Sequence, residues 1–449
     1  MAVVIVGGDA AGMSAASKIR RELPGRRIVA FERSPHTSYS ACGMPYYIAG
    51  IVERVDDLVA RSPEAFRDRY GIDVRIRHEV VSVDVAGRRV GVRKLDEGTE
   101  FWEPYDQLLL ATGASPIRPP LPGADAAGVH GLSTLASGIA VHRDIELHRP
   151  RTAVIVGGGY IGLEMAEALI VRGLDVSLVE RAPQVMGTLD PDMGALVSEA
   201  LREVGVALYL EEALTALETK AGRVSAVATD RRTLPADLVI LALGVRPESA
   251  LAKEAGIELG AKGAIRVNSR METSIEGVWA AGDCAESFHL VSRQGVHIAL
   301  GTVANKQGLV AGTNIAGGRA VFPGVVGTAV SKICKYEVGR TGLLESECSA
   351  LGLDAVSATI ESRTRVGYYP GAGPITVKLV AERAGGRLLG GQIVGLEGSA
   401  KRIDVLATAL TAGMSVQQIA DLDLSYAPPF SPVWDPVQTA ARQALKKVH

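Results

Sequence analysis

The 449-residue chain has few cysteines, few aromatic residues and no excess of either charge, and these shortages exclude several classes of protein. Four cysteines cannot build a disulfide scaffold, so we expect a reducing compartment. Lys and Arg (48) nearly balance Asp and Glu (50), which leaves no basic surplus for binding nucleic acid. No stretch approaches the roughly 20 uninterrupted apolar residues that span a bilayer, and no basic region precedes the apolar N-terminus as in a signal peptide. We therefore expect a cytoplasmic protein that binds neither nucleic acid nor membranes.

Glycine is abundant, with 51 residues, and two glycine clusters have the same surroundings. Residues 2–6 and 153–156 are short apolar runs, and each is followed by a glycine cluster and then by a helical pattern. A strand, a tight glycine turn and a helix open a βαβ unit, so the pattern predicts an α/β protein with parallel sheets. The two copies lie 150 residues apart, from Gly7 to Gly157, which indicates two nucleotide-binding units.

The second cluster, Gly157–Gly162, is a complete G-x-G-x-x-G motif. Glycines permit the tight turn and let the backbone approach a pyrophosphate, which then meets the free N–H groups of the helix N-terminus. Glu180 ends the next apolar run, where a carboxylate accepts hydrogen bonds from ribose hydroxyls and repels a 2′-phosphate. This favours NADH over NADPH as the hydride donor, although the adjacent Arg181 weakens the preference and keeps NADPH open.

The first cluster, Gly7–Gly12, has Asp9 at the place of the middle glycine, and Glu32 follows 20 residues after Gly12. A glycine turn in an α/β unit without a nucleotide is the alternative for this copy. Against that alternative, residues 273–283 fit the T-x6-A-x-G-D pattern found near the end of FAD-binding domains in flavoproteins with two dinucleotide sites. Residues 111–113 fit a second marker of those flavoproteins. Four markers in this order favour FAD together with NAD(P)H.

Residues 38–47 place Cys42 in an S-x-x-x-C-G-x-P-Y context. Together with residues 304–308, 327–329, 368–371 and 426–429, this segment resembles the single-cysteine branch of the pyridine nucleotide-disulfide oxidoreductase family. That branch contains coenzyme A-disulfide reductases, NADH oxidases and persulfide reductases, and the resemblance covers essentially the whole chain. It implies two Rossmann-like dinucleotide-binding domains and a C-terminal α+β dimerisation domain in a homodimer. The expected domains are 1–113 with 247–321 for FAD, 114–246 for NAD(P)H and 322–449 for dimerisation.

The resemblance also implies roles for individual residues. Cys42 would be the redox residue, while Tyr160 would gate the nicotinamide site and Glu164 would order the nicotinamide and flavin environment. Tyr369 and Tyr426 would act from the partner subunit on the departing thiolate, with packing at a dimer interface as their alternative role. The implied cofactor-binding residues are Gly7, Gly8, Ala10, Ala11, Gly12, Glu32, Arg33, Val80, Ala111, Thr112, Gly113, Gly157, Gly159, Tyr160, Ile161, Gly162, Glu164, Glu180, Gly244, Gly282 and Asp283. The implied substrate-binding residues are Ser14, Lys18, Arg21, Ser38 and His297.

No second cysteine lies close to Cys42 in the sequence, and this limits the chemistry that Cys42 can carry out. Dithiol relatives use a C-x4-C pair, whereas Tyr47 stands five residues after Cys42 here. A lone cysteine needs a second sulfur or an oxygen from the substrate, so a mixed disulfide, a persulfide or a sulfenic acid all fit. The thiolate requires stabilisation, which we expect from the flavin edge and from helix N-terminal amides. A small buried structural cysteine is the alternative.

Three departures from the family patterns bear on the substrate. Ala10 stands where peroxidases and water-forming oxidases carry a histidine, which argues against those two activities. Ala41 and Trp434 stand where coenzyme A-disulfide reductases carry asparagine and lysine. Lys18 and Arg21, which are candidates for binding the substrate, are equally explained as the solvent-exposed face of a helix. We predict an FAD-dependent NAD(P)H oxidoreductase that reduces a small disulfide or persulfide through Cys42, with coenzyme A disulfide as the first candidate. An NADH oxidase that forms hydrogen peroxide, an electron-transfer module for a protein partner and a redox-sensing flavoprotein are the alternatives, and no metal site is expected.

Overall fold

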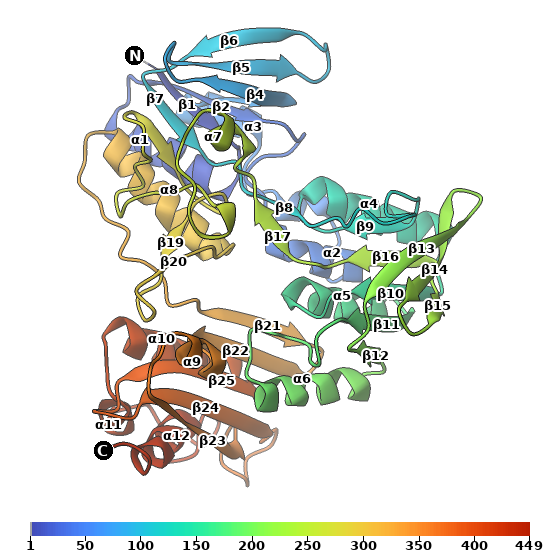
Figure 1. Cartoon of the computed structure of the whole chain (residues 1–449), viewed down its shortest axis with the longest axis vertical. Helices are drawn as coiled ribbons and strands as arrows, with labels where there is room; N and C mark the ends of the chain where they lie inside the picture. The colour runs from blue at the N-terminus through green and yellow to red at the C-terminus, as the bar shows by residue number, and fades with distance from the viewer. Residues whose placement is uncertain (1) are drawn as a thin grey trace.

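Two parallel sheets, each of five strands, organise the computed structural model, which describes residues 2–449 (Figure 1). The first sheet has the order β18-β7-β1-β2-β3 and consists of Val278–Ala280, Gln107–Leu110, Ala2–Val6, Arg27–Glu32 and Asp73–Ile76. The second has the order β12-β11-β10-β16-β9 and consists of Ala207–Leu210, Asp175–Glu180, Thr152–Val156, Leu238–Leu241 and Val129–Gly131. The central strands are apolar and buried because helices or further strands cover both faces. This arrangement confirms the expected α/β fold with two Rossmann-like units.

The first unit is built around the first sheet. Its helices α1 and α8 lie side by side (Figure 1), and the contact is close because small residues meet there. A Cβ at Gly308 would clash with the backbone of Ala11, and a Cβ at Gly312 would lie 2.7 Å from the Ala15 carbonyl oxygen. Further elements of this unit are α1 (Ala10–Glu22), α3 (Pro63–Tyr70), β4 (His78–Asp84), β5 (Arg89–Lys94), β6 (Glu100–Pro104), α7 (Ala250–Glu254), β19 (Ser287–Phe288), β20 (Gly295–Val296) and α8 (Gly301–Ile315).

The second unit is built around the second sheet and is joined to the first by the antiparallel pair β8 (Ala114–Pro116) and β17 (Val245–Pro247). The chain passes through β8 into the second unit and returns through β17, after which β18 and α8 complete the first unit (Figure 1). The expected domain boundaries near 113 and 247 fall at this pair, and the assignment of a nucleotide to each unit stays a prediction. Its other elements are α4 (Leu135–His148), α5 (Tyr160–Val171), α6 (Pro191–Glu203), β13 (Leu214–Lys220), β14 (Arg223–Thr229) and β15 (Thr233–Pro235).

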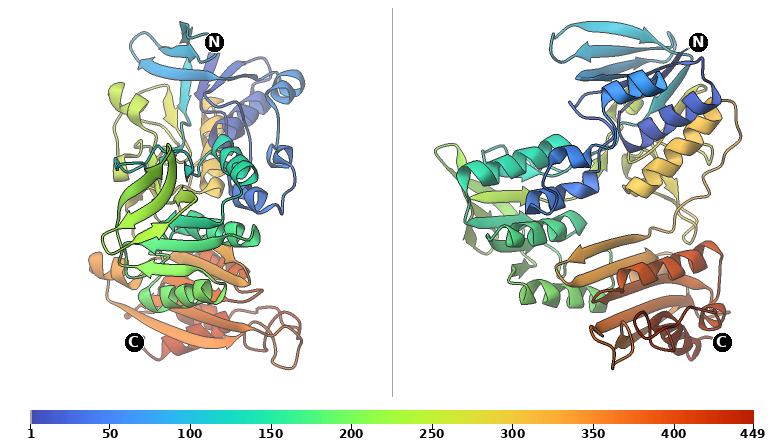
Figure 2. Two further views of the ribbon diagram at one scale, coloured as in Figure 1. Left: turned by 90° about the vertical axis from the view of Figure 1, so that its right-hand side faces the viewer. Right: turned by 180° about the vertical axis from the view of Figure 1, so that it is seen from behind.

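The C-terminal unit is an antiparallel sheet with helices, at the opposite end of the molecule from β4–β6 (Figure 2). Its sheet order is β21-β22-β25-β24-β23, and every residue of the central strand β25 is buried. This unit confirms the expected α+β architecture. Its elements are β21 (Ala329–Ile333), β22 (Tyr336–Gly342), α9 (Glu345–Ala350), β23 (Ala355–Arg363), β24 (Pro374–Glu382), β25 (Leu388–Gly395), α10 (Ile403–Thr411), α11 (Val416–Ala420) and α12 (Pro436–Leu445).

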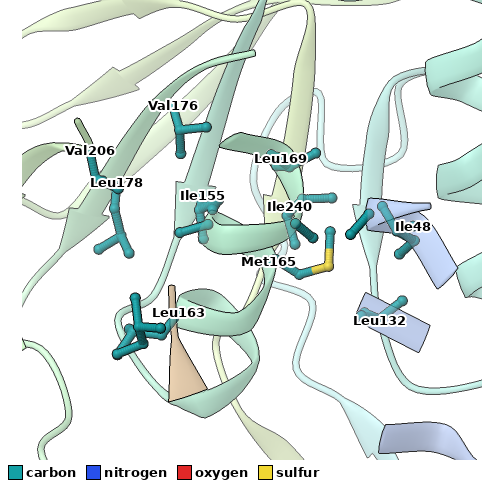
Figure 3. Close-up of a cluster of buried hydrophobic side chains, with 14 of the residues drawn as sticks. Ile48, Leu132, Ile155, Leu163, Met165, Leu169, Val176, Leu178, Val206 and Ile240 are labelled. Carbon is teal, nitrogen blue, oxygen red and sulfur yellow. The ribbon is translucent and has the colours of Figure 1, made fainter. Parts of the chain in front are cut away.

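Helix α2 (Met44–Ala49) comes from the first part of the chain but packs on the second unit. Ile48 is fully buried beside Leu132 and Met165 in the core of the second unit (Figure 3). Tyr47 stacks on His142 of α4, with ring centroids 4.5 Å apart. The segment that ends in Cys42, just before α2, therefore lies at the junction of the two units.

Both glycine-turn helices begin earlier than the sequence pattern predicts. The helical patterns after the two glycine clusters predict helices over 13–22 and 163–172, whereas α1 begins at Ala10 and α5 at Tyr160. The first helical turn overlaps the glycine motif, so its residues carry no apolar periodicity of their own. Across residues 2–449, no helix combines the length and apolar character needed to span a membrane.

The contact between α1 and α8 predicts a stability effect of one added methyl group. Gly308→Ala forces a Cβ against the Ala11 backbone and should destabilise the first unit by about 1–3 kcal/mol. Gly301→Ala, in the same helix, meets nothing within 4 Å and serves as the control, with no loss of stability. Thermal unfolding of the two variants and the parent protein measures the difference. Equal midpoints for both variants would contradict the close packing.

Candidate active site

The second glycine turn has the geometry that a bound pyrophosphate requires. Gly157 has a φ of +110°, and a Cβ at Gly157 would clash with the Ala242 carbonyl, while one at Gly162 would clash with Gly157. A Cβ at Gly159 would instead meet nothing within 4 Å, because this glycine faces open space at the N-terminus of α5. Glu180 accepts hydrogen bonds from the Gly158 nitrogen at 2.7 Å and from the Ala182 nitrogen at 2.8 Å. The residues predicted from this motif are thus together at one edge of the second sheet.

The first glycine turn repeats this geometry. Gly7 has a φ of +113°, and a Cβ at Gly7 would clash with the Ala111 carbonyl, while one at Gly12 would clash with Gly7. Glu32 accepts hydrogen bonds from the Gly8 nitrogen and the Ser34 nitrogen, both at 2.8 Å. Gly7, Gly12 and Glu32 thus make the same contacts as Gly157, Gly162 and Glu180 in the second turn. Asp9 stands at the position of the middle glycine.

Asp9 links the first glycine turn to the segment that carries Cys42. The Asp9 Oδ1 accepts a hydrogen bond from the Tyr39 nitrogen at 3.1 Å, and the Gly8 carbonyl accepts one from the Ser38 nitrogen at 3.0 Å. Burial, reinforced by the nearby carboxylates of Glu32 and Asp283, raises the pKa of Asp9 from 3.8 to about 6. Sequence reasoning treated Asp9 only as a defect of the motif and missed this contact.

The residues around Asp283 fit a flavin. Among residues 2–449, the buried Asp283 Oδ1 has no hydrogen-bond partner, and burial raises the pKa of this carboxyl. A buried acceptor without a donor is costly, and a ribityl hydroxyl of FAD would supply one. The adjacent Gly282 packs against α1, its nitrogen donating to Gln307 at 2.8 Å, and the His297 Nε2 lies 2.7 Å from the Asp283 carbonyl oxygen.

The other predicted cofactor residues lie around these two turns. Ala10 and Ala11 form the first turn of α1, and Ile161 lies in the first turn of α5. The Thr112 hydroxyl donates to the Glu248 carbonyl at 2.5 Å, and the Arg33 guanidinium lies 4.0 Å from the Glu248 carboxylate. Val80 is buried in β4, while Gly113 and Gly244 have positive φ angles at the ends of the connection between the units.

Cys42 lies in a single helical turn, Ala41–Gly43, and is exposed. Partial desolvation, together with the negative charges of Glu164, Asp283 and Asp9, raises the pKa of the Cys42 thiol. The polypeptide therefore disfavours the thiolate, and its expected stabilisation is left to a bound cofactor.

Tyr160 and Glu164 lie on α5, and Glu164 contacts the C-terminal unit. Tyr160 is half-buried, with its hydroxyl oxygen 3.4 Å from the Thr188 Oγ1. The Glu164 carboxylate accepts a hydrogen bond from Ser331 of β21 at 3.2 Å, and burial with the nearby charge of Glu167 raises the pKa of Glu164.

The predicted substrate residues are divided between α1 and the Cys42 segment. On α1, the Ser14 hydroxyl donates to Asn305 at 2.7 Å, Lys18 pairs with Glu22 at 2.6 Å, and Arg21 is exposed. Ser38 lies four residues before Cys42 with a φ of +50°. The ion pair between Lys18 and Glu22 is typical of the solvent-exposed face of a helix. The substrate-binding roles of Ser14, Lys18, Arg21, Ser38 and His297 stay predictions.

A cavity of about 620 Å³ next to the Cys42 segment was missed from the sequence. Its wall is tied to that segment, because the Ala60 nitrogen donates to the Ser38 carbonyl at 2.8 Å. Arg61 and Arg69 line the cavity, and neither guanidinium has an ion-pair partner in the described chain. Arg61 and Arg69 belong to none of the motifs found in the sequence, so no motif spacing indicates that they line a common cavity.

Tyr369 and Tyr426 belong to the C-terminal unit, whereas Cys42 precedes α2 in the middle of the molecule (Figure 1). Within residues 2–449 of one chain, neither tyrosine hydrogen-bonds to Cys42. Their part in the site would therefore come from a second copy, and it stays a prediction. Across the same residues, no cluster of three His, Cys, Asp or Glu side chains is placed to hold a metal ion.

Comparison with known proteins identifies the family of the chain. The family described as pyridine nucleotide-disulphide oxidoreductase matches residues 1–308, and its dimerisation domain matches residues 328–436. A relative from Pyrococcus abyssi named NAD(P)H sulfur oxidoreductase (CoA-dependent) is 42% identical over 98% of this chain and 97% of its own. An NADH oxidase from Methanocaldococcus jannaschii is 39% identical over 100% of this chain and 99% of its own. The solved structure of an NAD-dependent persulfide reductase from A. fulgidus aligns with a TM-score of 0.96 at 39% identity, covering 100% of this chain and 83% of that one.

The electrostatics around Cys42 predict a slow thiol in protein freed of nucleotides. The midpoint of alkylation by iodoacetamide against pH should lie above that of an unperturbed cysteine peptide, and Glu164→Gln should lower it by removing a nearby charge. Mass spectrometry of a Cys334→Ser background assigns the label, because Cys284 and Cys348 are buried. A midpoint below that of the peptide would contradict this account.

The raised pKa of Asp9 predicts a stability gain in Asp9→Asn. The folded protein holds the Asp9 proton more tightly than the unfolded chain, so ionisation destabilises the fold above pH 6, and the penalty vanishes below about pH 4. In nucleotide-free protein at pH 8 the variant should gain about 2–3 kcal/mol, measured by thermal unfolding. At pH 4 the gain should disappear. The exposed Asp57→Asn is the control, and an equal effect in both variants would contradict the assignment.

Proposed function

Because the chain belongs to the pyridine nucleotide-disulphide oxidoreductase family, we propose that it reduces a small disulfide or persulfide through Cys42, with coenzyme A disulfide as the first candidate. At the coarser level the chain is an NAD(P)H-dependent flavin oxidoreductase of the persulfide reductase, coenzyme A-disulfide reductase or NADH oxidase type. The observation that carries the finer proposal is a single exposed cysteine next to the first of two equivalent glycine turns.

The two glycine turns divide the nucleotides between them in this proposal. Residues 1–113 and 247–321 would hold FAD, with Asp283 as acceptor for its ribityl hydroxyls, and residues 114–246 would hold NADH, with Glu180 as acceptor for its ribose hydroxyls. When bound, FAD carries an electron pair from the nicotinamide to sulfur. Tyr160 covers the nicotinamide position until NADH arrives, and Arg181 keeps NADPH as a weaker donor.

The sulfur chemistry balances with one cysteine. The Cys42 thiolate attacks one sulfur of the disulfide, which forms a mixed disulfide and releases the first thiolate. Two electrons and one proton then cleave the mixed disulfide, so that the Cys42 thiolate is restored and the second thiol leaves. With a persulfide, the Cys42 thiolate attacks the outer sulfur and the parent thiolate leaves, which forms a Cys42 persulfide; two electrons and one proton then release hydrosulfide and restore the Cys42 thiolate.

The cavity that contains Arg61 and Arg69 supports an acceptor with an anionic tail. Neither guanidinium has a carboxylate partner in the described chain, so both can bind phosphates, and the cavity is linked to the Cys42 segment through the hydrogen bond from Ala60 to Ser38. The relative from P. abyssi carries coenzyme A dependence in its name. A nucleotide-bearing thiol such as coenzyme A matches this chemistry better than a small uncharged disulfide.

A homodimer completes the site in this proposal. Aromatic and apolar side chains are exposed on the C-terminal unit around the two predicted tyrosines: Tyr368, Tyr426, Phe430, Val433 and Trp434. Such a patch is typical of an interaction surface. The dimerisation domain assigned to residues 328–436 contains or adjoins all of them, so a second copy would carry Tyr369 and Tyr426 toward Cys42.

Anaerobic turnover tests the proposal. Protein loaded with FAD should oxidise NADH rapidly when coenzyme A disulfide is present and stall after one flavin reduction without it. Cys42→Ser should lose at least 100-fold in disulfide turnover, by order of magnitude, while its flavin is still reduced by NADH, because only the sulfur step needs the thiolate. Cys334→Ser is the control and should keep the parent rate.

Two results would redirect the assignment. Full disulfide turnover by Cys42→Ser would refute a role for Cys42. Flavin reduction that resumes only when air enters, at equal rates in both variants, would identify an NADH oxidase that forms hydrogen peroxide.

A further inference from the structure

A charge cluster centred on the buried side chains of Lys378 and Asp190 joins the second unit to the C-terminal unit. The side chain of Lys378 on β24 is only 4% exposed, and its Nζ lies 2.8 Å from Asp192, 2.7 Å from Glu345 and 3.3 Å from Asp190. Asp190 caps the N-terminus of α6 and Asp192 lies in its first turn, so both belong to the second unit. One lysine therefore ties the start of α6 to the C-terminal sheet.

Asp190 is held by more than Lys378. The Asp190 nitrogen donates to the Gln392 Oε1 at 2.7 Å, and the Gln392 Nε2 donates back to the Asp190 Oδ2 at 2.7 Å. The Glu345 nitrogen donates to the other carboxylate oxygen of Asp190 at 3.0 Å. Asp190 and Gln392 are each 1% exposed. Such a fully bonded buried set contributes less to stability than to fixing one arrangement.

The residues between Glu180 and Asp190, here named the 181–190 loop, connect this cluster to the second glycine turn. The Met186 nitrogen donates to the Gly158 carbonyl at 2.7 Å. The Thr188 Oγ1 lies 3.4 Å from the Tyr160 hydroxyl. The loop thus begins after Glu180, contacts the glycine turn through Met186 and Tyr160 through Thr188, and ends at Asp190 in the Lys378 cluster.

We propose that Lys378 and Gln392 are positioning residues for the NADH site, which hold the 181–190 loop by its Asp190 end. This inference rests on the proposed function, because it takes NADH as the ligand of the second glycine turn. Neither residue touches the nucleotide. They act through Asp190, since a shift of this end of the loop moves the Met186 and Thr188 contacts that set the glycine turn and Tyr160.

Two variants and one control separate positioning from general interface stability. Lys378→Met leaves the buried carboxylate of Asp190 without its cation, and Gln392→Met removes two hydrogen bonds to Asp190 without changing charge. Lys335→Met is the control, because Lys335 pairs with Glu203 at 3.3 Å across the same two units but at the other end of α6. Each variant is measured as the FAD-loaded full chain.

The dissociation constant for NADH should rise about tenfold in Lys378→Met and Gln392→Met and stay unchanged in Lys335→Met. Reoxidation of dithionite-reduced enzyme by coenzyme A disulfide should stay at the parent rate in all three. Trypsin followed by mass spectrometry gives a readout independent of activity. Cleavage after the exposed Arg181 should accelerate in the two test variants, and NADH should slow it.

The inference would be overturned if Gln392→Met bound NADH as tightly as the parent protein and was cleaved after Arg181 at the parent rate. This outcome is decisive whether or not Lys378→Met folds. Equal weakening in Lys335→Met would also overturn it, since the effect would then belong to the interface in general. Failure of the premise taken from the proposed function, that NADH binds the second glycine turn, is distinguishable, because the parent protein itself would then neither bind nor oxidise NADH.

Discussion

The packing of α2 against the second unit is the constraint on which the active site depends. Cys42 comes directly before a helix whose apolar residues, such as Ile48, are buried in the core of a different unit from the one that supplies the preceding strand β2. The same segment is tied back to the first glycine turn through Asp9. One short stretch of chain is therefore fixed at both ends, in two units, and its sulfur cannot move relative to either nucleotide turn without breaking a buried contact.

The site built on this constraint is electrostatically unfavourable for the reactive form of its own cysteine. Glu164, Asp283 and Asp9 all raise the pKa of Cys42, and burial raises the pKa of each of these carboxyls in turn. An arrangement of this kind is costly in the empty protein and makes sense when a ligand supplies the missing donors and positive potential. The Asp283 oxygen that lacks a donor is the clearest instance.

The sequence predicted the parts of this site that rest on local backbone geometry. Gly157 and Gly162 are required by sterics within one turn, and Glu180 follows at the end of the next strand, so a motif records them. The contacts that sequence reasoning missed join residues without a periodic relation. Asp9 meets Tyr39 because two loops fold together, and Lys378 meets Asp192 across 186 positions and two units. Spacing carries no information about such pairs, since only the packing of whole units brings them together.

The proposed role of Cys42 as a single redox cysteine would explain why it is exposed. In a dithiol site the second sulfur is part of the chain and the pair can be enclosed, whereas here Tyr47 occupies that position and turns away to stack on α4. In the proposed reaction the second sulfur would arrive from solvent, which the exposed position of Cys42 permits, and the cavity lined by Arg61 and Arg69 would hold the rest of the substrate. An open site gives up exclusion of water and oxygen, and within one chain nothing from the C-terminal unit hydrogen-bonds to Cys42 in the described residues to restore it. In the proposed homodimer a second copy would close the site, and assembly and chemistry would then be coupled through the exposed aromatic side chains of the C-terminal unit.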